Sequence, residues 1–294
     1  MSARERARGV LAAIEPRRVA LYGVVVLMLA FYLAPLESGV ATAFKTPAGF
    51  RSSGPFALPR GAELTFDAWG QAAARLGPGL RNSALMTIPA TVISALLGSL
   101  AAYGLTSLSW RGQAGVLVVF VAGVFIPYQA VLVPLTQFWS FVDLAGLVPV
   151  AAVATYEGLI QLSITHIAYG IPICTVLFRS YYATMDAEML EAARLDGASA
   201  ATVYRRIVLP LSVPIFAVTL IYQFTQIWND LLFAIVLVND PGNQVVTVAL
   251  NQLRGSFVQQ YNLQMAGAFV AALPTLVVYV LFGEQFAKGV AGES

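Results

Sequence analysis

The sequence is short of charge, lysine, histidine and cysteine, and these shortages narrow the class of protein. Charged residues make up 11% of the 294 residues and hydrophobic residues 58%, whereas an ordinary soluble domain carries about 25% charged residues. The composition therefore predicts an integral membrane protein. Basic residues cluster only within 4–18, ahead of an apolar run, and this placement is typical of a membrane topology signal. We therefore expect a lipid membrane around the chain and no nucleic-acid partner.

Motifs for phosphate binding, metal binding and hydrolysis are missing. The only lysines are Lys45 and Lys288, and neither belongs to a G-x-x-x-x-G-K-[ST] phosphate loop. The single histidine, His166, excludes a histidine-rich metal site, and no G-x-S-x-G motif occurs. The single cysteine, Cys174, lies in an apolar run, where we expect a small buried residue. The sequence predicts no catalytic residue, no metal and no cofactor in this chain.

Long apolar runs are abundant. A helix that crosses a bilayer needs about 20 mostly apolar residues, and six runs meet this requirement. They are Val19–Val40, Ser83–Leu108, Ala114–Phe138, Gly158–Phe178, Leu211–Val238 and Leu263–Phe286. We therefore predict an all-α integral membrane protein with about six transmembrane helices in a single domain, residues 1–294.

The first apolar run has an alternative interpretation. Basic residues precede it and the small residues 41–43 follow it, which is also the pattern of a cleaved signal peptide. The run is long for the apolar part of a signal peptide, and five more spans follow. We therefore favour a retained transmembrane helix.

The basic residues predict the orientation, because short cytoplasmic loops are enriched in Lys and Arg. With six spans, one side of the membrane receives Arg4, Arg6, Arg8, Arg17, Arg18, Arg111, Arg179, Arg194, Arg205, Arg206 and Lys288. The other side receives Lys45, Arg51, Arg60, Arg75, Arg81 and Arg254. Most of this second set lies in a long first loop, and long loops count for less. We predict a protein of the cell (inner) membrane with both termini in the cytoplasm.

One stretch, EAARLDGASAATVYRRIVLP (191–210), is charged although long apolar runs flank it. Asp186 is a plausible N-cap for a helix that leads into this stretch. Gly197 can adopt the left-handed conformation that ends a helix, and Ser199 can cap a second helix. The sequence therefore predicts a helix, a glycine turn and another helix on the cytoplasmic side.

Two interpretations of the segment 186–210 follow from its residues alone. It is either a connector that lies on the bilayer surface or a docking surface for another protein. Ala192 and Ala193 favour docking, because a face of small residues allows another surface to approach closely.

The spacing within this segment resembles the EAA loop of the membrane subunits of bacterial and archaeal ABC importers. The matching residues are Glu191, Ala192, Ala193, Gly197, Ile207, Leu209 and Pro210. Other stretches resemble the carbohydrate-uptake branch of that family, close to the second permease subunit of the maltose system, and cover most of the chain after residue 80. They are RNSALMTIPATV (81–92), AAYGL (101–105), IPYQAVLVPL (126–135), HIAYGIPICTVLFRSYY (166–182), WNDLLFAIVL (228–237) and EQFAKGVAGES (284–294).

The resemblance implies an ABC importer permease fold and a set of partners. These are a second permease subunit, two copies of a cytoplasmic ATPase subunit, and an extracellular or periplasmic sugar-binding protein that delivers the sugar substrate. ATP and Mg would be bound by the ATPase subunits. The segment 186–210 would be the coupling helix that docks on one ATPase, and this chain would be a non-catalytic subunit.

Polar residues within the apolar runs are candidates for the translocation path. They are Gln129, Gln223, Gln226, Asn229 and Asp230. Gln226 and Asn229 are three residues apart, so a continuous helix would place them on one face. A stripe of polar groups is costly against lipid, so it faces either a neighbouring helix or the path.

Two other classes of protein compete with the permease interpretation. A stand-alone secondary transporter or channel would use charges within the membrane, for which Asp230 and Glu157 are the candidates. A membrane enzyme would need a catalytic constellation, and the sequence contains none that we recognise.

Overall fold

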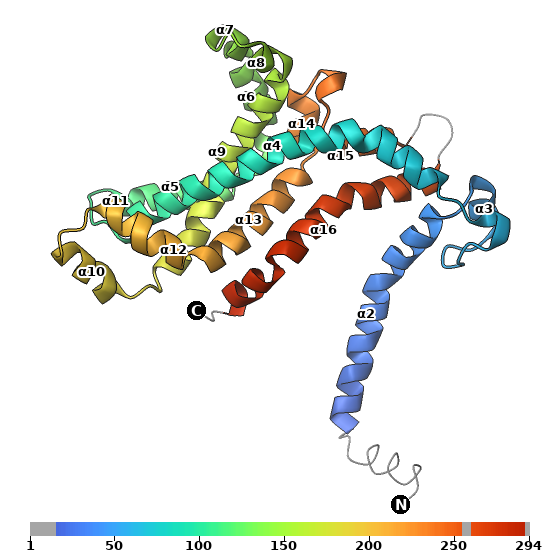
Figure 1. The fold of residues 1–294 in the computed structure, drawn as a ribbon, viewed down its shortest axis with the longest axis horizontal. Coiled ribbons are helices and arrows are strands. Elements are labelled where there is room, and N and C mark those ends of the chain that lie inside the picture. The colour runs from blue at the N-terminus through green and yellow to red at the C-terminus, as the bar shows by residue number, and fades with distance from the viewer. Residues whose placement is uncertain (1–15, 255–259, 292–294) are drawn as a thin grey trace, which may run out of the picture. The chain divides into compact units, whose positions relative to one another are not determined.

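The computed structural model describes residues 16–254 and 260–291 (Figure 1). The described residues are 81% helical, and no β-strand occurs among them. The predicted all-α class is therefore confirmed. Contacts within the chain define two compact units, one made of residues 1–74 and 253–270 and the other of residues 75–252 and 271–294. This division does not test the single permease domain, which stays a prediction.

The first unit contains the long helix α2 and residues 44–66, which connect α2 to α4. Its elements are α2 (Pro16–Ala43), α3 (Pro47–Ser52), η1 (Gly61–Glu63) and the first turns of α4 (Asp67–Thr106) and α16 (Tyr261–Ala291). A buried lysine holds the connection, because the Nζ of Lys45 donates a hydrogen bond to the Gly54 carbonyl at 2.8 Å. The Asn262 amide donates to the Lys45 carbonyl at 3.0 Å. The most apolar window of α2 has no residue buried within the chain.

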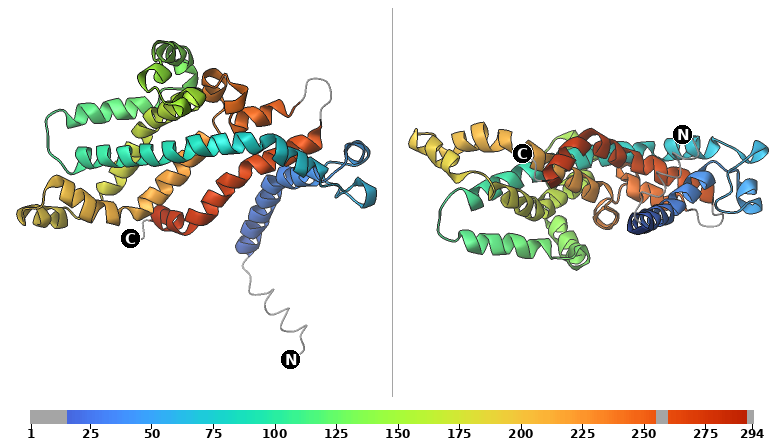
Figure 2. Two further views of the ribbon diagram at one scale, coloured as in Figure 1. Left: turned by 45° about the horizontal axis from the view of Figure 1, so that its top comes forward. Right: turned by 90° about the horizontal axis from the view of Figure 1, so that it is seen from below.

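The second unit contains the remaining helices. After α4 these are α5 (Gln113–Val124), α6 (Tyr128–Phe141), α7 (Leu144–Leu147), α8 (Ala151–Thr155), α9 (Glu157–Tyr182), α10 (Ala187–Leu195), α11 (Ala200–Val203), η2 (Tyr204–Val208), α12 (Leu209–Leu211), α13 (Val213–Trp228), α14 (Leu232–Leu237), η3 (Pro241–Asn243), α15 (Val246–Gln252) and α16. Helix α9 packs against both α5 and α13 (Figure 2). It leads directly to α10 at its C-terminal end, whereas α7 and α8 lie at its other end (Figure 1).

The number of spans agrees with the prediction. Among the described residues, five helices are long and apolar enough to cross a membrane, and the bent pair of Ala200–Leu211 and Val213–Trp228 makes six when counted as one span. Helix α4 begins at Asp67, well before the predicted Ser83. The helix continues through Pro78, and proline is tolerated inside membrane helices when neighbouring groups satisfy the backbone.

The predicted third span is broken. Helix α5 ends at Val124 and α6 begins at Tyr128 after Pro127, which is the N-cap of α6. Proline disfavours a helical conformation in the residue before it, so a break at Ile126-Pro127 has a local cause. The Ile126 carbonyl accepts a hydrogen bond from the Tyr169 hydroxyl, which satisfies one of the groups that the break exposes.

The predicted fifth span is bent at its start and ends early. The helix axes on either side of Ser212 differ by 76°, and Pro214 in the first turn of α13 has no N–H to continue the earlier hydrogen bonds. Helix α13 ends at Trp228, and α14 resumes the chain at Leu232. The predicted Leu211–Val238 is therefore two helices joined by a turn.

Small residues bring α4 and α9 close together. A β-carbon built at Gly98 would overlap the β-carbon of Cys174, and it would lie 3.0 Å from the Thr175 nitrogen. Close packing at small residues is a common way for membrane helices to associate. Cys174 is fully buried in this contact, as predicted.

Candidate functional site

The charged segment is a helix, a glycine turn and a second helix. The Asp186 carboxylate caps α10 by accepting a hydrogen bond from the Glu188 N–H at 2.8 Å. The Ser199 hydroxyl caps α11 by accepting from the Thr202 N–H at 3.2 Å. Both predicted caps are confirmed. Each cap joins residues only a few positions apart, so it could be predicted from the local sequence.

Gly197 has the predicted left-handed conformation, with φ of 86°. Its N–H donates to the Arg194 carbonyl at 3.0 Å, and the Ala198 N–H donates to the Ala193 carbonyl at 3.0 Å. These two bonds form a Schellman motif, which satisfies carbonyl groups that the helix end leaves free. A β-carbon at Gly197 would meet no atom within 4 Å. Glycine is therefore required by the backbone conformation and not by lack of space.

Buried contacts anchor this segment to the membrane helices. Leu190 is buried among Phe178, Tyr182 and their neighbours. The Ser99 hydroxyl, on α4, shares hydrogen bonds with Tyr182 at 2.6 Å and with Tyr204 at 2.8 Å. The Ser99 hydroxyl thus joins α4, the end of α9 and the π-helical turn η2. The charged segment therefore has a fixed inner side.

The outer side of α10 is exposed. Glu188, Glu191, Ala192 and Leu195 are exposed there, and we call these four residues the docking face. Leu195 is 88% exposed, although it is a large apolar residue and its helix lies outside the predicted apolar spans. Ala193 is half-buried and packs inward, so Ala192 and Ala193 do not form one face as expected.

The second half of the motif lies mostly inward. Ile207 and Leu209 are half-buried against the cluster around Phe178, whereas Pro210 is exposed just before the bend at Ser212. These residues therefore shape the connection from the docking face into α13.

A polar cavity of 140 Å³ lies among α5, α6, α9 and α13. Its polar lining residues are Tyr128, His166, Tyr169, Tyr222, Gln223 and Gln226. Such a group of hydrogen-bonding and aromatic side chains within apolar helices is costly against lipid. The cavity is therefore the best candidate within the spans for a ligand site.

His166 and Asp230 meet beside this cavity. The His166 Nε2 lies 3.4 Å from Asp230 Oδ2, and both side chains are almost fully buried. The Asp230 carboxylate also caps α14, because it accepts hydrogen bonds from the N–H groups of Phe233 at 3.4 Å and Ala234 at 3.2 Å. The Asp230 carboxylate is thus held by backbone N–H groups of α14 and lies close to the imidazole ring.

The five path candidates do not lie together. Gln223 and Gln226 line the polar cavity. Gln129 is exposed and is not one of the lining residues. The Asn229 amide donates to the Thr225 carbonyl at 2.8 Å and caps the end of α13. The expected continuous stripe from Gln223 to Asp230 is therefore wrong, because α13 ends at Trp228.

Sequence reasoning missed two of the lining residues. They are His166 and Tyr169, neither of which is among the predicted path residues. Both lie on α9, one helical turn apart, and this spacing could have indicated a shared face.

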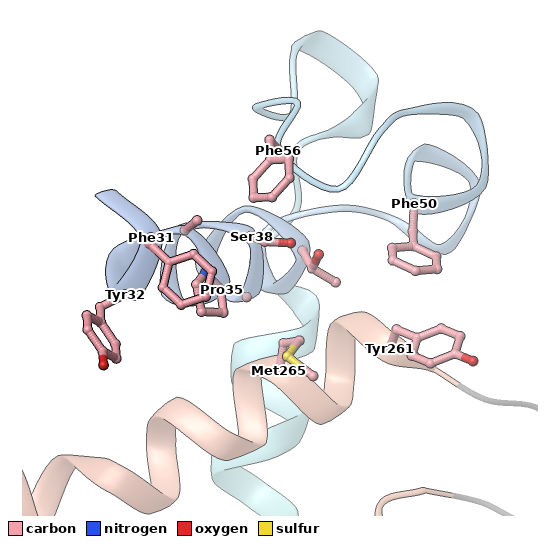
Figure 3. Close-up of a pocket in the computed structure, with 11 residues that line it drawn as sticks. Phe31, Tyr32, Pro35, Ser38, Phe50, Phe56, Tyr261 and Met265 are labelled. Atoms are coloured by element: carbon pink, nitrogen blue, oxygen red, sulfur yellow. The ribbon is translucent and has the colours of Figure 1, made fainter. Parts of the chain in front are cut away.

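Two larger grooves are apolar. One, of 530 Å³, lies within the first unit, and Figure 3 shows Phe31, Pro35 and Met265 among its lining side chains. The other, of 550 Å³, lies within the second unit and includes Phe224 and Trp228. Both suit lipid chains or neighbouring helices better than a polar ligand.

The fold and the charged segment together define a class of protein. An all-α chain with five or six spans and an EAA-type segment between α9 and α13 has the features of the membrane permease subunit of an ABC importer, and the family comparison below shows that it is one. The subunit itself is non-catalytic. The stand-alone transporter and the membrane enzyme are thereby set aside.

The comparisons with known proteins give the family. The chain belongs to the family described as "Binding-protein-dependent transport system inner membrane component", which matches residues 94–283. It is 49% identical over 288 residues to "Xylose/arabinose import permease protein XacI" of Haloferax volcanii, covering 95% of this chain and 93% of the relative. It is 39% identical to "Probable ABC transporter permease protein PH1216" of Pyrococcus horikoshii, covering 94% of this chain and 96% of the relative.

A solved structure has the same fold. The chain matches a subunit of a bacterial ABC transporter involved in the import of the acidic polysaccharide alginate, with a TM-score of 0.67 and 17% identity. The match covers 97% of this chain and 99% of that subunit. This likeness shows the fold. Membership of the family makes the chain a multi-pass permease of the inner membrane that works with a partner permease, an ATPase and a binding protein.

Proposed function

We propose that this permease imports a sugar, in particular a pentose such as xylose or arabinose. The proposal is supported by the relative XacI, whose printed name specifies xylose and arabinose import and which aligns with almost the whole chain. The polar cavity supports a hydroxylated substrate, since its lining combines tyrosines, glutamines and a histidine.

The docking face is proposed to couple ATP hydrolysis to transport. Two copies of a cytoplasmic ATPase would bind ATP and Mg, a second permease would complete the path, and an external binding protein would deliver the sugar. The observation that carries this proposal is the exposed Leu195 on a helix whose inner side is anchored by Leu190. Glu191 and Ala192 would contact the ATPase, while Gly197, Ile207, Leu209 and Pro210 would hold the segment in shape.

This arrangement requires the docking face and both termini to lie in the cytoplasm. The orientation can be tested with single cysteines in a Cys174→Ala background, at the exposed positions Ala62 and Ala201. Ala62 is chosen over its neighbour Gly61, which has a positive φ that a cysteine would strain. A membrane-impermeant thiol reagent added to intact cells should label position 62 and not 201, and the reverse pattern contradicts the orientation.

The path is proposed to pass the polar cavity, with Gln223 and Gln226 as its nearest groups. Asn229 and Asp230 would shape the turn beside the path, and Gln129 would lie near its edge. Hydrogen bonding between helices alone is the competing role for these residues.

The experiment that tests the proposed function is transport by the reconstituted complex. Uptake of labelled xylose, arabinose, glucose and glycerol would be measured with the permease, its partner permease, the ATPase and the binding protein. We expect ATP-dependent uptake of the pentoses. Uptake of no sugar by an assembled, ATP-hydrolysing complex contradicts the substrate, and uptake without ATP contradicts the mechanism.

A further inference from the structure

The polar cavity has two buried polar side chains on its wall, and the ring nitrogen of one of them has no hydrogen-bond partner among the described residues. Gln223 is 4% exposed, and its side chain lines the cavity. His166 is 2% exposed, and its Nε2 has no aligned hydrogen bond although Asp230 lies close by. A buried polar group without a partner is unfavourable. The His166 nitrogen is such a group, and the Gln223 amide lies on the same cavity wall, so a ligand in the cavity could form hydrogen bonds with both.

The position of the Gln223 amide depends on a glycine. A β-carbon at Gly170 would overlap the Gln223 amide, and it would lie 3.1 Å from the Ser94 β-carbon. The absence of a side chain at Gly170 therefore makes the space that this amide occupies. Gly170 and Gln223 belong to different helices, α9 and α13, so the space results from the way these helices pack.

Aromatic rings complete the walls. The rings of Tyr128 and Tyr169 are perpendicular with centroids 4.7 Å apart, and the buried Phe233 stacks on Tyr128 at 4.7 Å. The Tyr169 hydroxyl is held by the Ile126 carbonyl. On the remaining side, the Gln226 amide donates to the Tyr222 hydroxyl at 3.3 Å. The aromatic walls are thus held in place by several contacts.

The size and chemistry of the cavity select a class of ligand. Its 140 Å³ is well below the ~300–1,000 Å³ of sites for drug-sized ligands. No lysine, arginine or carboxylate is among its described lining residues, so a charged ligand would have no counter-ion there. An apolar ligand would leave the His166 Nε2 without a partner. A small neutral ligand with several hydroxyl groups fits, because a hydroxyl both donates and accepts.

We propose that this cavity is a sugar-binding subsite within this subunit, which takes one neutral sugar ring. The Gln223 amide and the His166 imidazole would bind hydroxyl groups, and Tyr128 and Tyr169 would contact the apolar face of the ring. Asp230 is a positioning residue that acts through His166. The subsite rests on the proposed function, namely that the permease imports a sugar.

The test measures whether Gln223 recognises one hydroxyl. The complete reconstituted complex would transport xylose and each singly deoxygenated xylose, at concentrations that saturate the binding protein. For the wild-type permease, we expect loss of one particular hydroxyl to slow uptake about 3- to 10-fold, the effect of one hydrogen bond. In Gln223→Leu, xylose itself should slow by that factor, and the analogue without that hydroxyl should slow no further, since paired losses are not additive.

A second variant and a control keep the test independent of folding. Gly170→Ala displaces the Gln223 amide without removing it and should abolish the same discrimination. Thr219→Val changes a buried polar residue on the same helix α13 that is not part of the cavity lining, and it should keep the wild-type profile.

The outcomes separate the subsite from the proposed function. An analogue profile in Gln223→Leu and Gly170→Ala that equals the wild-type profile overturns the subsite while sugar import stands. The same change of profile in Thr219→Val also overturns it. Uptake of no sugar by the wild-type complex overturns the proposed function and the subsite together.

Discussion

The docking face and the polar cavity are built in opposite ways. The docking face is exposed, and its shape depends on hydrogen bonds between residues a few positions apart, such as Asp186 with Glu188. The polar cavity is lined by residues of four helices, α5, α6, α9 and α13, and the buried amide of Gln223 lies on its wall. The difference suits a rigid surface for a protein partner in one case and an unfilled site for a small ligand in the other.

Two helices nevertheless connect the two regions. Helix α9 carries His166 in its middle and Tyr182 at its end, where Tyr182 is hydrogen-bonded to Ser99. Helix α13 begins at the bend after the charged segment and carries Gln223. A displacement of the docking face would therefore act on helices that line the cavity, which is the physical basis of the coupling proposed above.

The largest expected effect comes from disrupting the contact between α4 and α9, on which both regions depend. Gly98→Val places a branched side chain against Cys174 and α9, and overpacking of this kind costs about 1–3 kcal/mol. Both ATPase association and sugar uptake should fall, and the complex should melt at a lower temperature in a thermal stability assay. Gly104→Val is the matched control on α4, because no atom lies within 4 Å of a β-carbon there. Equal melting of the two variants would contradict the close contact.

The next effect should be confined to the cavity side. Asp230→Ala removes the cap of α14 and the contact to His166, and loss of a cap costs about 0.5–2 kcal/mol. Sugar uptake should fall while the ATPase still copurifies with the permease. Asp230→Asn keeps one acceptor oxygen and should lie between the wild type and the alanine variant. Loss of ATPase binding in Asp230→Ala would mean that the two regions are not separable.

A comparable change on the docking side should do the reverse. Gly197→Val must adopt a left-handed conformation, which costs about 1–2 kcal/mol for a residue with a β-carbon. ATPase copurification or the ratio of sugar moved to ATP hydrolysed should fall. Gly197→Asn should retain most function, since asparagine adopts this conformation more readily. Equal transport by Gly197→Val and the wild type would contradict the claim that coupled transport requires this glycine turn.

The smallest effect is expected at the second cap. Ser199→Ala removes the hydroxyl that accepts the Thr202 N–H, at a cost of about 1 kcal/mol. Coupled transport should decline modestly, and Ser199→Asp should restore it because aspartate also caps helices. A loss as severe as that of Gly197→Val would show that Ser199 has a role beyond capping.

The same contrast explains what the sequence could predict. The caps at Asp186 and Ser199 and the turn at Gly197 follow from residues within one or two helical turns, so local rules predict them. The break at Ile126-Pro127 also has a local signal, but an apolar run that is long enough to span hides it. The pairing of His166 with Asp230 joins residues far apart in the sequence. It depends on where α13 ends, and no periodicity in the sequence indicates that end.

The central claim is that the docking face contacts an ATPase and does not lie on the bilayer. The most direct measurement is photo-crosslinking of the assembled complex from a probe placed at Leu195, with a probe at Val280 as the control. Val280 is 83% exposed on the apolar helix α16. We predict a crosslink from position 195 to the ATPase subunit and none from position 280. A crosslink from position 195 to lipid alone, in an intact complex, would contradict the account.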